Sequence, residues 1–195
     1  MTKRVEFDPE DVLLLVLDAN ERLLGRSRLN GITRLEKLVF LLANEGGAGE
    51  IASKFLFRPH NFGPFSSAVY NAKDFLSGVG LVKEEVQPLP SYYAGAAELA
   101  IEDMSAEGPR DEATPEPVAH ERTFQLTDLG RTAAANLRKD LDRQWPELTN
   151  GVDRIVSKFG DVPLNQIIRY VYRRYPETTT KSIHPEARRV RAEAR

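Results

Sequence analysis

The sequence contains no cysteine among its 195 residues, and it has no long apolar run. Without cysteine there are no disulfides, no thiolate zinc sites, no iron–sulfur clusters and no thiol catalysis. No apolar run exceeds six residues, as at Val12–Leu17, whereas a membrane-spanning helix needs about 20. The N-terminus also lacks the apolar segment of a signal peptide. We therefore expect a cytoplasmic protein that does not bind a membrane.

Patterns typical of catalytic, metal-binding or phosphate-binding sites are also absent from the sequence. The three histidines, His60, His120 and His184, lie far apart and have no metal-binding spacing. The glycine-rich segment Glu45–Glu50 is not followed by the Lys-Ser or Lys-Thr pair of a phosphate loop. No nucleophile, histidine and acid can be grouped from their order in the chain. We predict no enzymatic activity, no cofactor and no metal site.

The charge is unevenly spread, although the net charge is only −2. Residues 96–122 carry eight acids against two arginines, a net charge of −6, and residues 173–195 carry seven cations against three acids, a net charge of +4. This pattern predicts an acidic insert and a basic tail. The insert, residues 87–122, is also rich in proline, alanine and glycine, which favours an exposed linker with a short strand at 98–102. A DNA mimic or a binding site for a basic partner are the alternatives.

Apolar spacing predicts a mainly helical α+β protein. Helices are expected where caps precede apolar stripes: from Asp8-Pro9 to about Leu24, from a Thr33/Glu36 capping box to Gly46, from Pro64 to Gly78 or Gly80, from Thr127 through Leu141, over 148–159 and over 163–175. Short strands are expected at 54–58, 81–86 and 123–126, and Asn61–Ser66 is expected as the turn that opens the third helix. The segment from Thr178 onward is expected to be a mobile tail.

Three helices, a strand, a long connection, a returning strand and another helix form the order of a winged helix. Three segments, Thr33–Leu42, Phe62–Ser66 and Tyr170–Glu177, resemble an uncharacterised prokaryotic family typified by YwgA. The first two also resemble, more distantly, the SocA-type Panacea domain of antitoxins. Where the YwgA-like family usually has tyrosine before Gly-Pro, this chain has Phe62. The resemblance implies a winged helix and a gene-regulatory, antitoxin or defence-associated role.

We therefore predict a winged helix-turn-helix domain over 8–145, interrupted by the acidic insert in its wing at 87–122. A C-terminal helical pair at 146–176 packs against this domain or forms a homodimer, and a basic tail follows at 177–195. Tyr170, Tyr172 and Tyr175 cannot share one helical face, so at least two are expected in the core or in a dimer contact rather than stacked on bases.

In a winged helix the third helix enters the DNA major groove. The candidate nucleic-acid-binding residues are the polar face of that helix, the residues before it and the tail cations: Arg58, His60, Asn61, Ser66, Ser67, Asn71, Lys73, Arg188, Arg189 and Arg191. Lys73 is the only cation on the helical face and Asp74 adjoins it, so an ordinary solvated face is the competing interpretation. For the residues before the helix, the competing interpretation is a turn that Phe62 and Phe65 hold by packing. For the tail, it is a segment that serves only solubility.

The predicted function is a non-enzymatic prokaryotic winged-helix regulator that binds double-stranded DNA or acts like an antitoxin. The alternative is a protein-binding adaptor of a defence or toxin–antitoxin system, in which the same fold contacts a protein partner. A positive surface over the third helix and the tail favours DNA. A neutral surface with exposed apolar residues favours a protein.

Overall fold

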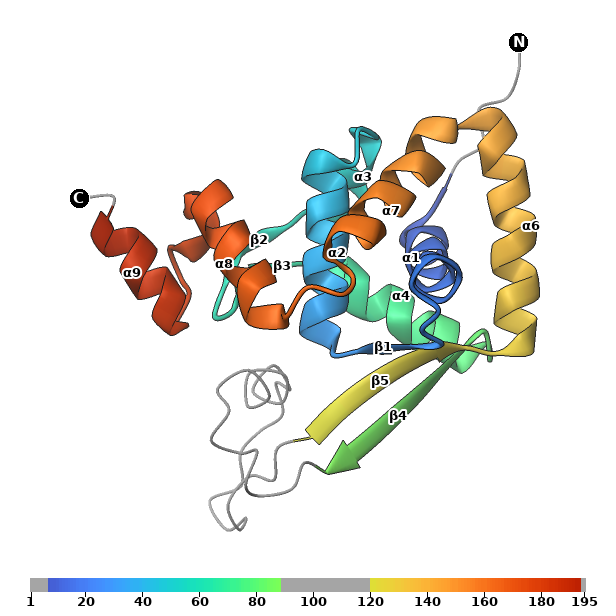
Figure 1. Ribbon diagram of the computed structural model, residues 1–195, viewed down its shortest axis with the longest axis horizontal. Helices are drawn as coiled ribbons and strands as arrows, with labels where there is room; N and C mark the ends of the chain where they lie inside the picture. Colours follow the sequence, from blue (N-terminus) through green and yellow to red (C-terminus); the bar gives the residue numbers. More distant parts are fainter. Residues whose placement is uncertain (1–6, 89–119, 194–195) are drawn as a thin grey trace.

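The computed structural model describes residues 7–88 and 120–193. The described chain is mainly helical with small antiparallel sheets, which confirms the predicted α+β class (Figure 1). Its helices are α1 (Pro9–Leu24), α2 (Ile32–Glu45), α3 (Glu50–Phe55), α4 (Ser67–Gly78), α6 (Asp128–Gln144), α7 (Pro146–Phe159), α8 (Leu164–Arg174), the 3-10 turn η2 (Pro176–Thr179) and α9 (Pro185–Glu193). Its strands are β1 (Arg28–Asn30), β2 (Arg58–His60), β3 (Gly63–Phe65), β4 (Val82–Pro88) and β5 (His120–Leu126).

The larger sheet has the strand order β1-β5-β4, and both pairs are antiparallel. Leu29 of β1 pairs with Phe124 of β5, and Leu126 of β5 pairs with Val82 of β4. These four apolar side chains are buried, so the sheet packs one face on the helices. The second sheet is the short hairpin of β2 and β3, which lies beside η2.

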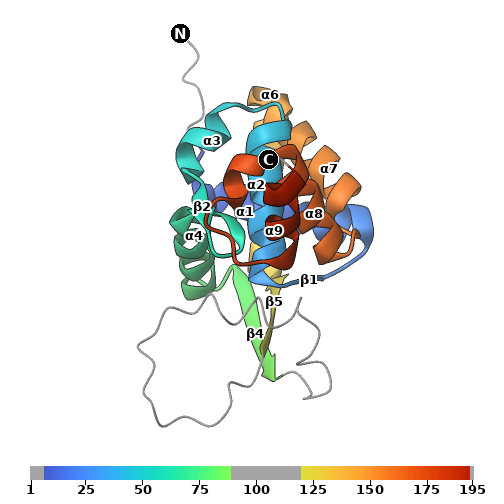
Figure 2. The ribbon, with the colours of Figure 1, turned by 90° about the vertical axis from the view of Figure 1, so that its left-hand side faces the viewer.

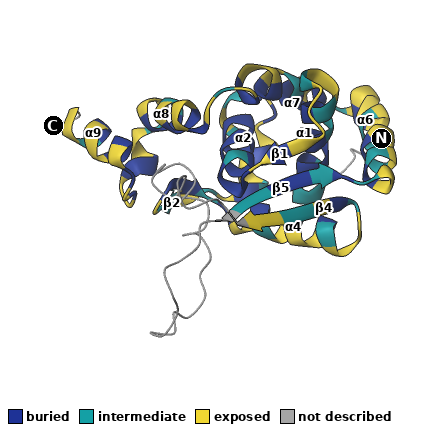
Figure 3. Cartoon of the chain, turned by 60° about the horizontal axis from the view of Figure 1, so that its bottom comes forward, coloured by how far each residue is buried: buried dark blue, intermediate teal, exposed yellow. Residues whose placement is uncertain are grey.

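Helix α1 lies at the centre of the helical layer and packs against α4, α6 and α7 (Figures 1 and 2). Helix α2 packs against α7 and α8. One cluster of buried apolar residues runs from Phe7 to Val190, so the helices at 146–176 share a core with residues 8–145 (Figure 3). No helix within the described ranges combines the length and the apolar character that crossing a membrane requires.

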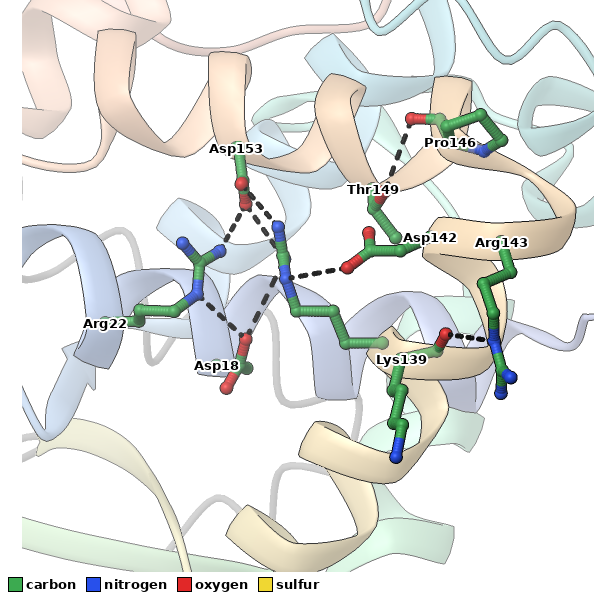
Figure 4. Close-up of polar contacts among 9 residues, drawn as sticks. Asp18, Arg22, Lys139, Asp142, Arg143, Pro146, Thr149 and Asp153 are labelled. Atoms are coloured by element: carbon green, nitrogen blue, oxygen red, sulfur yellow. Dashed lines mark hydrogen bonds and ion pairs between the residues drawn. The ribbon is translucent and has the colours of Figure 1, made fainter.

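An ion-pair network joins α1, α6 and α7 at their polar edge (Figure 4). Arg138 of α6 contacts both carboxylate oxygens of Asp153 on α7, at 2.5 and 3.0 Å. Arg22 of α1 reaches the same carboxylate at 2.5 Å and also Asp18 at 3.4 Å. Arg138 and Asp153 are half-buried, and this bidentate pair fixes how α6 and α7 meet.

Several helix ends are as predicted from the sequence. The Asp11 carboxylate accepts the backbone N–H of Asp8 at 3.0 Å at the start of α1, and Gly25 ends that helix in the left-handed region with φ 65°. Thr127 caps α6, its hydroxyl oxygen accepting the N–H of Gly130 at 3.0 Å. The predicted apolar stripes of α7 and α8 are buried.

The segment between α2 and α4 differs from the prediction. Helix α2 begins at Ile32, so Thr33 lies inside the helix and forms no capping box with Glu36. Residues 54–58 are not a strand: they contain the end of α3, and β2 begins at Arg58. Pro64 lies in β3 rather than in the first turn of a helix, and α4 begins at Ser67. The Glu36 carboxylate accepts instead from the Lys37 ammonium and from the Ser66 N–H.

The segment from Thr178 onward was predicted to be mobile, which is wrong for residues 178–193. They form the end of η2 and the helix α9, in which Ala187 and Val190 are buried against α8. Hydroxyl groups of Thr178 and Thr179 donate to backbone carbonyls three residues earlier, and Arg191 donates to carbonyls of Thr179 and Ser182. These local hydrogen bonds order a segment whose composition is polar.

The ends of the predicted insert are strand. β4 extends to Pro88 and β5 begins at His120, so 87–88 and 120–122 pair in the sheet. Glu121 accepts a hydrogen bond from the Asn30 side chain at 2.9 Å. The rest of the insert, with the strand predicted at 98–102, lies outside the described residues.

Candidate functional site

The three segments that carry the family resemblance meet around a buried charge pair. Lys37 of α2 is fully buried, and its Nζ donates to Glu36 Oε2 and to the Pro64 carbonyl, both at 2.9 Å. Glu36 Oε1 accepts the backbone N–H of Ser66 at 3.1 Å. The Ser66 hydroxyl donates to the Phe55 carbonyl. A buried cation needs such partners, because an unpaired one costs several kcal/mol.

Tyr172 of α8 adds the third segment to this junction. It is fully buried, and its hydroxyl lies 2.8 Å from the Ser182 Oγ, which donates to the Asn61 carbonyl at 3.0 Å. Burial raises the pKa of Tyr172 to about 12. Gly63 has φ 95°, and a Cβ there would lie 2.6 Å from a Tyr172 ring carbon, so only glycine fits. The motif residues therefore build a structural joint between α2, the β2–β3 hairpin and α8.

Two of the predicted DNA contacts are not on the surface. Ser66 is 2% exposed and bonded within the joint, so its assignment to the polar face of the third helix is wrong. Lys73 is 8% exposed, with its Nζ 2.6 Å from Asp74 and 2.9 Å from Glu84, so it is not available to a phosphate as predicted. Helical spacing predicts both side chains on the surface, but it does not show the elements that pack against α4 and cover them.

The Lys73 cluster shifts the pKa values of its members. Burial by itself lowers the pKa of Lys73, but hydrogen bonds and charges of Asp74 and Glu84 outweigh it, so the pKa is raised. Burial raises the pKa of Glu84, but hydrogen bonds from Lys73 and Arg122 outweigh it, so the pKa is lowered. Arg122 of β5 donates to Glu84 at 2.7 Å. The cluster ties α4 to the β4–β5 hairpin.

The solvent side of α4 is neutral and partly apolar. Ser67 and Asn71 are exposed, as predicted, and so is Asp74. Phe75 and Val79, one helical turn apart, are 55% and 47% exposed. Leu129, in the first turn of α6, is 60% exposed, and the Thr127 hydroxyl beside it donates to the Gly80 carbonyl just beyond α4. We name Phe75, Val79 and Leu129 the α4 apolar patch.

The residues predicted before the third helix lie on the β2–β3 hairpin and the turn within it. Arg58 is exposed, and its guanidinium carbon lies 5.4 Å from the centre of the Phe65 ring. The His60 ring centre lies 4.9 Å from the same ring. The Asn61 side chain is exposed, while its carbonyl accepts from Ile183 N–H and from Ser182. The hairpin therefore presents exposed Arg58 over the Phe65 ring, in partial agreement with the predicted packed turn.

The predicted tail cations divide between solvent and interior. Arg188 and Arg189 on α9 are exposed, and Arg189 contacts Glu186 at 3.0 Å. Arg191 turns inward to the carbonyls of Thr179 and Ser182, so it holds the segment rather than a ligand. His184 accepts the N–H of Glu186 through Nδ1, and burial lowers its pKa. The predicted residues 58–61 lie on the β2–β3 hairpin, whereas Arg188 and Arg189 lie on α9. The hairpin contacts the C-terminal segment through the Asn61 carbonyl, which accepts from Ser182 and Ile183.

The tyrosines predicted for the core or a dimer contact lie in or against the core of this chain. Tyr172 is buried, and Tyr170 and Tyr175 are half-buried with their hydroxyls on the carboxylate of Glu45, at 2.9 and 3.1 Å. Burial and the Glu45 carboxylate raise the pKa of Tyr175 to about 12. Sequence reasoning missed the partners Glu36, Lys37 and Glu45, because nothing in the chain order links them to residues more than 25 positions away.

Within the described ranges, no three His, Asp or Glu side chains gather as a metal-binding group. A comparison of the chain with models of known protein families and with curated proteins found no match.

Proposed function

We propose that this chain is a non-enzymatic protein-binding adaptor built as a winged helix. Support for the winged helix comes from the element order α1-β1-α2-α4-β4-β5 and from the sheet order β1-β5-β4. In that arrangement α4 takes the place of the helix that reads DNA, and β4 and β5 form the wing. α3 and the β2–β3 hairpin are additions between α2 and α4.

The observation that carries the proposal is the solvent side of α4. Affinity for a duplex depends mainly on neutralising phosphates. The one lysine of α4, Lys73, is already ion-paired with Glu84 and Asp74. Phe75 and Val79 are exposed on α4, and Leu129 is exposed at the start of α6, which the Thr127 hydroxyl ties to Gly80 just beyond α4. Exposed apolar residues rimmed by polar ones, here Asn71 and Asp74, are typical of protein-binding surfaces. The resemblance to the YwgA-like family and, more distantly, to the SocA-type Panacea domain implies a partner from a defence or toxin–antitoxin system.

The adaptor is tested by co-purifying partners on tagged chain from its native cells, with the substitution Phe75→Asp in the α4 apolar patch. The matched control is Leu23→Asp, because Leu23 is an exposed apolar residue on α1. We expect the control to retain a stoichiometric protein partner and the patch variant to lose it. Equal retention by both variants, or no partner on the unchanged protein, would contradict the proposal. Circular dichroism of each variant checks that the fold is intact.

A DNA-binding regulator is the second candidate, and exposed Arg58, Arg188 and Arg189 are the observation that favours it. Its test is fluorescence anisotropy of a DNA fragment from upstream of the chain's own gene, with scrambled duplex as competitor. Binding that survives the competitor and weakens with salt is the expected result for a regulator. Equal, weak binding to both duplexes would exclude operator recognition.

A further inference from the structure

Helix α8 has the most basic solvent side among the described helices that pack on α2. Its exposed residues are all amides or arginines: Asn165, Gln166, Arg169, Arg173 and Arg174. The helix contains no carboxylate. Gln166, Arg169, Tyr170, Arg173 and Arg174 line an open groove of about 510 Å³. Helix α9 lies beside α8 and adds exposed Arg188 and Arg189 (Figures 1 and 2).

The arginines of this surface differ in how far they are already paired. Arg169 contacts Glu186 at 3.0 Å, and Arg189 contacts the same carboxylate. Arg173 has no ion pair or hydrogen-bond partner for its side chain among the residues that the structure describes. The Arg174 guanidinium lies 5.9 Å from the centre of the Tyr175 ring, a contact that leaves its donors open to solvent. Arg173 and Arg174 are therefore ready to bind an anion without losing an internal salt bridge.

From this arrangement we infer that the solvent side of α8 binds the phosphate backbone of a nucleic acid. Arginine offers a planar set of donors that matches phosphate oxygens two at a time. Arg169 and Arg173 are four residues apart on the same side of the helix, about 6 Å along its axis. The neighbouring amides of Asn165 and Gln166 are side chains that contact phosphates or base edges. A carboxylate-free helix also avoids the repulsion that Asp74 would impose at α4.

This surface is separate from the one that the adaptor uses. Helix α8 packs on α2, whereas α4 packs on α1, and the two lie apart in both views (Figures 1 and 2). Nucleic-acid binding by α8 therefore goes beyond the adaptor function and does not depend on it. A chain with both surfaces would bring a protein partner to a nucleic acid.

The test is a titration of the full chain against a fluorescent DNA duplex and an RNA of matched length, at several salt concentrations. We expect Arg173→Ala/Arg174→Ala to weaken binding about tenfold or more and to lower the slope of log K against log salt by about 2. The control Lys139→Ala/Arg143→Ala removes the same charge from exposed positions of α6. It should change affinity far less, because α6 lies at the other end of the molecule (Figure 1).

Two further measurements separate α8 from the alternatives. Ser67→Ala/Asn71→Ala on α4 should leave nucleic-acid affinity unchanged; a loss there, with none in the α8 variant, would overturn the inference and favour reading by α4. A polyglutamate peptide should compete poorly, and competition better than that of the duplex would overturn it in favour of an acidic protein ligand. Equal losses in the α8 and α6 variants, or no binding at all, would also overturn it. Because Arg173 and Arg174 are exposed, their variants are expected to fold normally.

Discussion

Lys37 of α2 and Lys73 of α4 face carboxylates inside the molecule, whereas Arg173 and Arg174 of α8 face solvent. Lys37 is fully buried and Lys73 is 8% exposed, and each has its Nζ within 3.0 Å of a carboxylate oxygen. Arg173 and Arg174 are exposed and have no ion pair with any described residue. Helices of similar length thus use their basic residues in opposite ways.

The contrast shows that the number of cations on a helix does not say whether it can bind an anion. A cation that is removed from water must be compensated by a carboxylate or by carbonyls. Such a cation is then paired inside the fold and is not available to a ligand. A cation that stays in water keeps its charge for a ligand. Substitutions in the first region are expected to lower stability, and substitutions in the second to lower binding only.

The largest effect is expected for Lys37→Met. Methionine fills a similar volume but leaves the Glu36 carboxylate without its cation and the Pro64 carbonyl without its donor. We expect the free energy of unfolding to fall by about 3–5 kcal/mol, measured by urea denaturation. The control Lys83→Met, at an exposed side chain, should change it by less than about 0.5 kcal/mol. Similar losses in both variants would remove the distinction between buried and exposed cations.

A smaller effect, with a pH dependence, is expected for Glu84→Gln. The pKa of Glu84 is lowered in the folded chain, so its contribution is present above the unfolded pKa, near 4.5, and is lost as the pH falls through the folded pKa. We expect the variant to be less stable by about 1–2 kcal/mol at neutral pH. The difference should shrink toward zero as the pH is lowered below 4.5, followed by urea denaturation across that range. A difference that does not change with pH would argue against the ion pair with Lys73.

Tyr172→Phe is expected to cost about 1 kcal/mol, because it removes the hydrogen bond to Ser182 in the joint between the two regions. The pKa of Tyr172 is raised from 10 to about 12, so the stability of the unchanged chain is full below pH 10 and falls as the pH rises toward 12. The variant should lose less stability over that interval. Tyrosinate absorbance of both proteins follows the titration, and its midpoint near 10 for every tyrosine would contradict the burial.

The smallest effect on stability is expected for Arg173→Ala/Arg174→Ala. Both side chains are exposed, so the free energy of unfolding should change by less than about 0.5 kcal/mol in total. Thermal unfolding of the double variant beside the unchanged chain measures it. A loss of more than 1 kcal/mol would mean that these arginines hold the fold and would weaken the contrast with Lys37.

Local patterns were enough for the helices that have strong caps and regular apolar spacing. Asp8 with Asp11, Gly25 and Thr127 act within one helical turn, so the chain order alone shows them. The buried stripes of α7 and α8 follow the helical period in the same way. The Thr33 capping box is wrong because α2 begins before Thr33, and the Glu36 carboxylate accepts instead from Lys37 beside it and from Ser66, 30 residues away.

The exposure of the predicted site residues agrees with the sequence-based prediction only in part. Arg58, Asn61, Ser67, Asn71, Arg188 and Arg189 lie on the surface as a helical or loop pattern predicts. Ser66 and Lys73 do not, because the joint and β4 cover them, and Arg191 turns to backbone carbonyls. Arg173 and Arg174 belong to the basic segment of the sequence. Only the packing of α8 shows that their guanidinium groups are exposed and have no ion pair with a described residue.

The sequence by itself determined the helical class, the positions of most helices and the sign of charge along the chain, because these depend on neighbours within a few residues. The tertiary structure decided which cations are buried and which are exposed. It also decided that a polar tail becomes η2 and α9, and that three motif segments form one joint. Those outcomes depend on groups that are far apart in the chain and meet only when the helices pack.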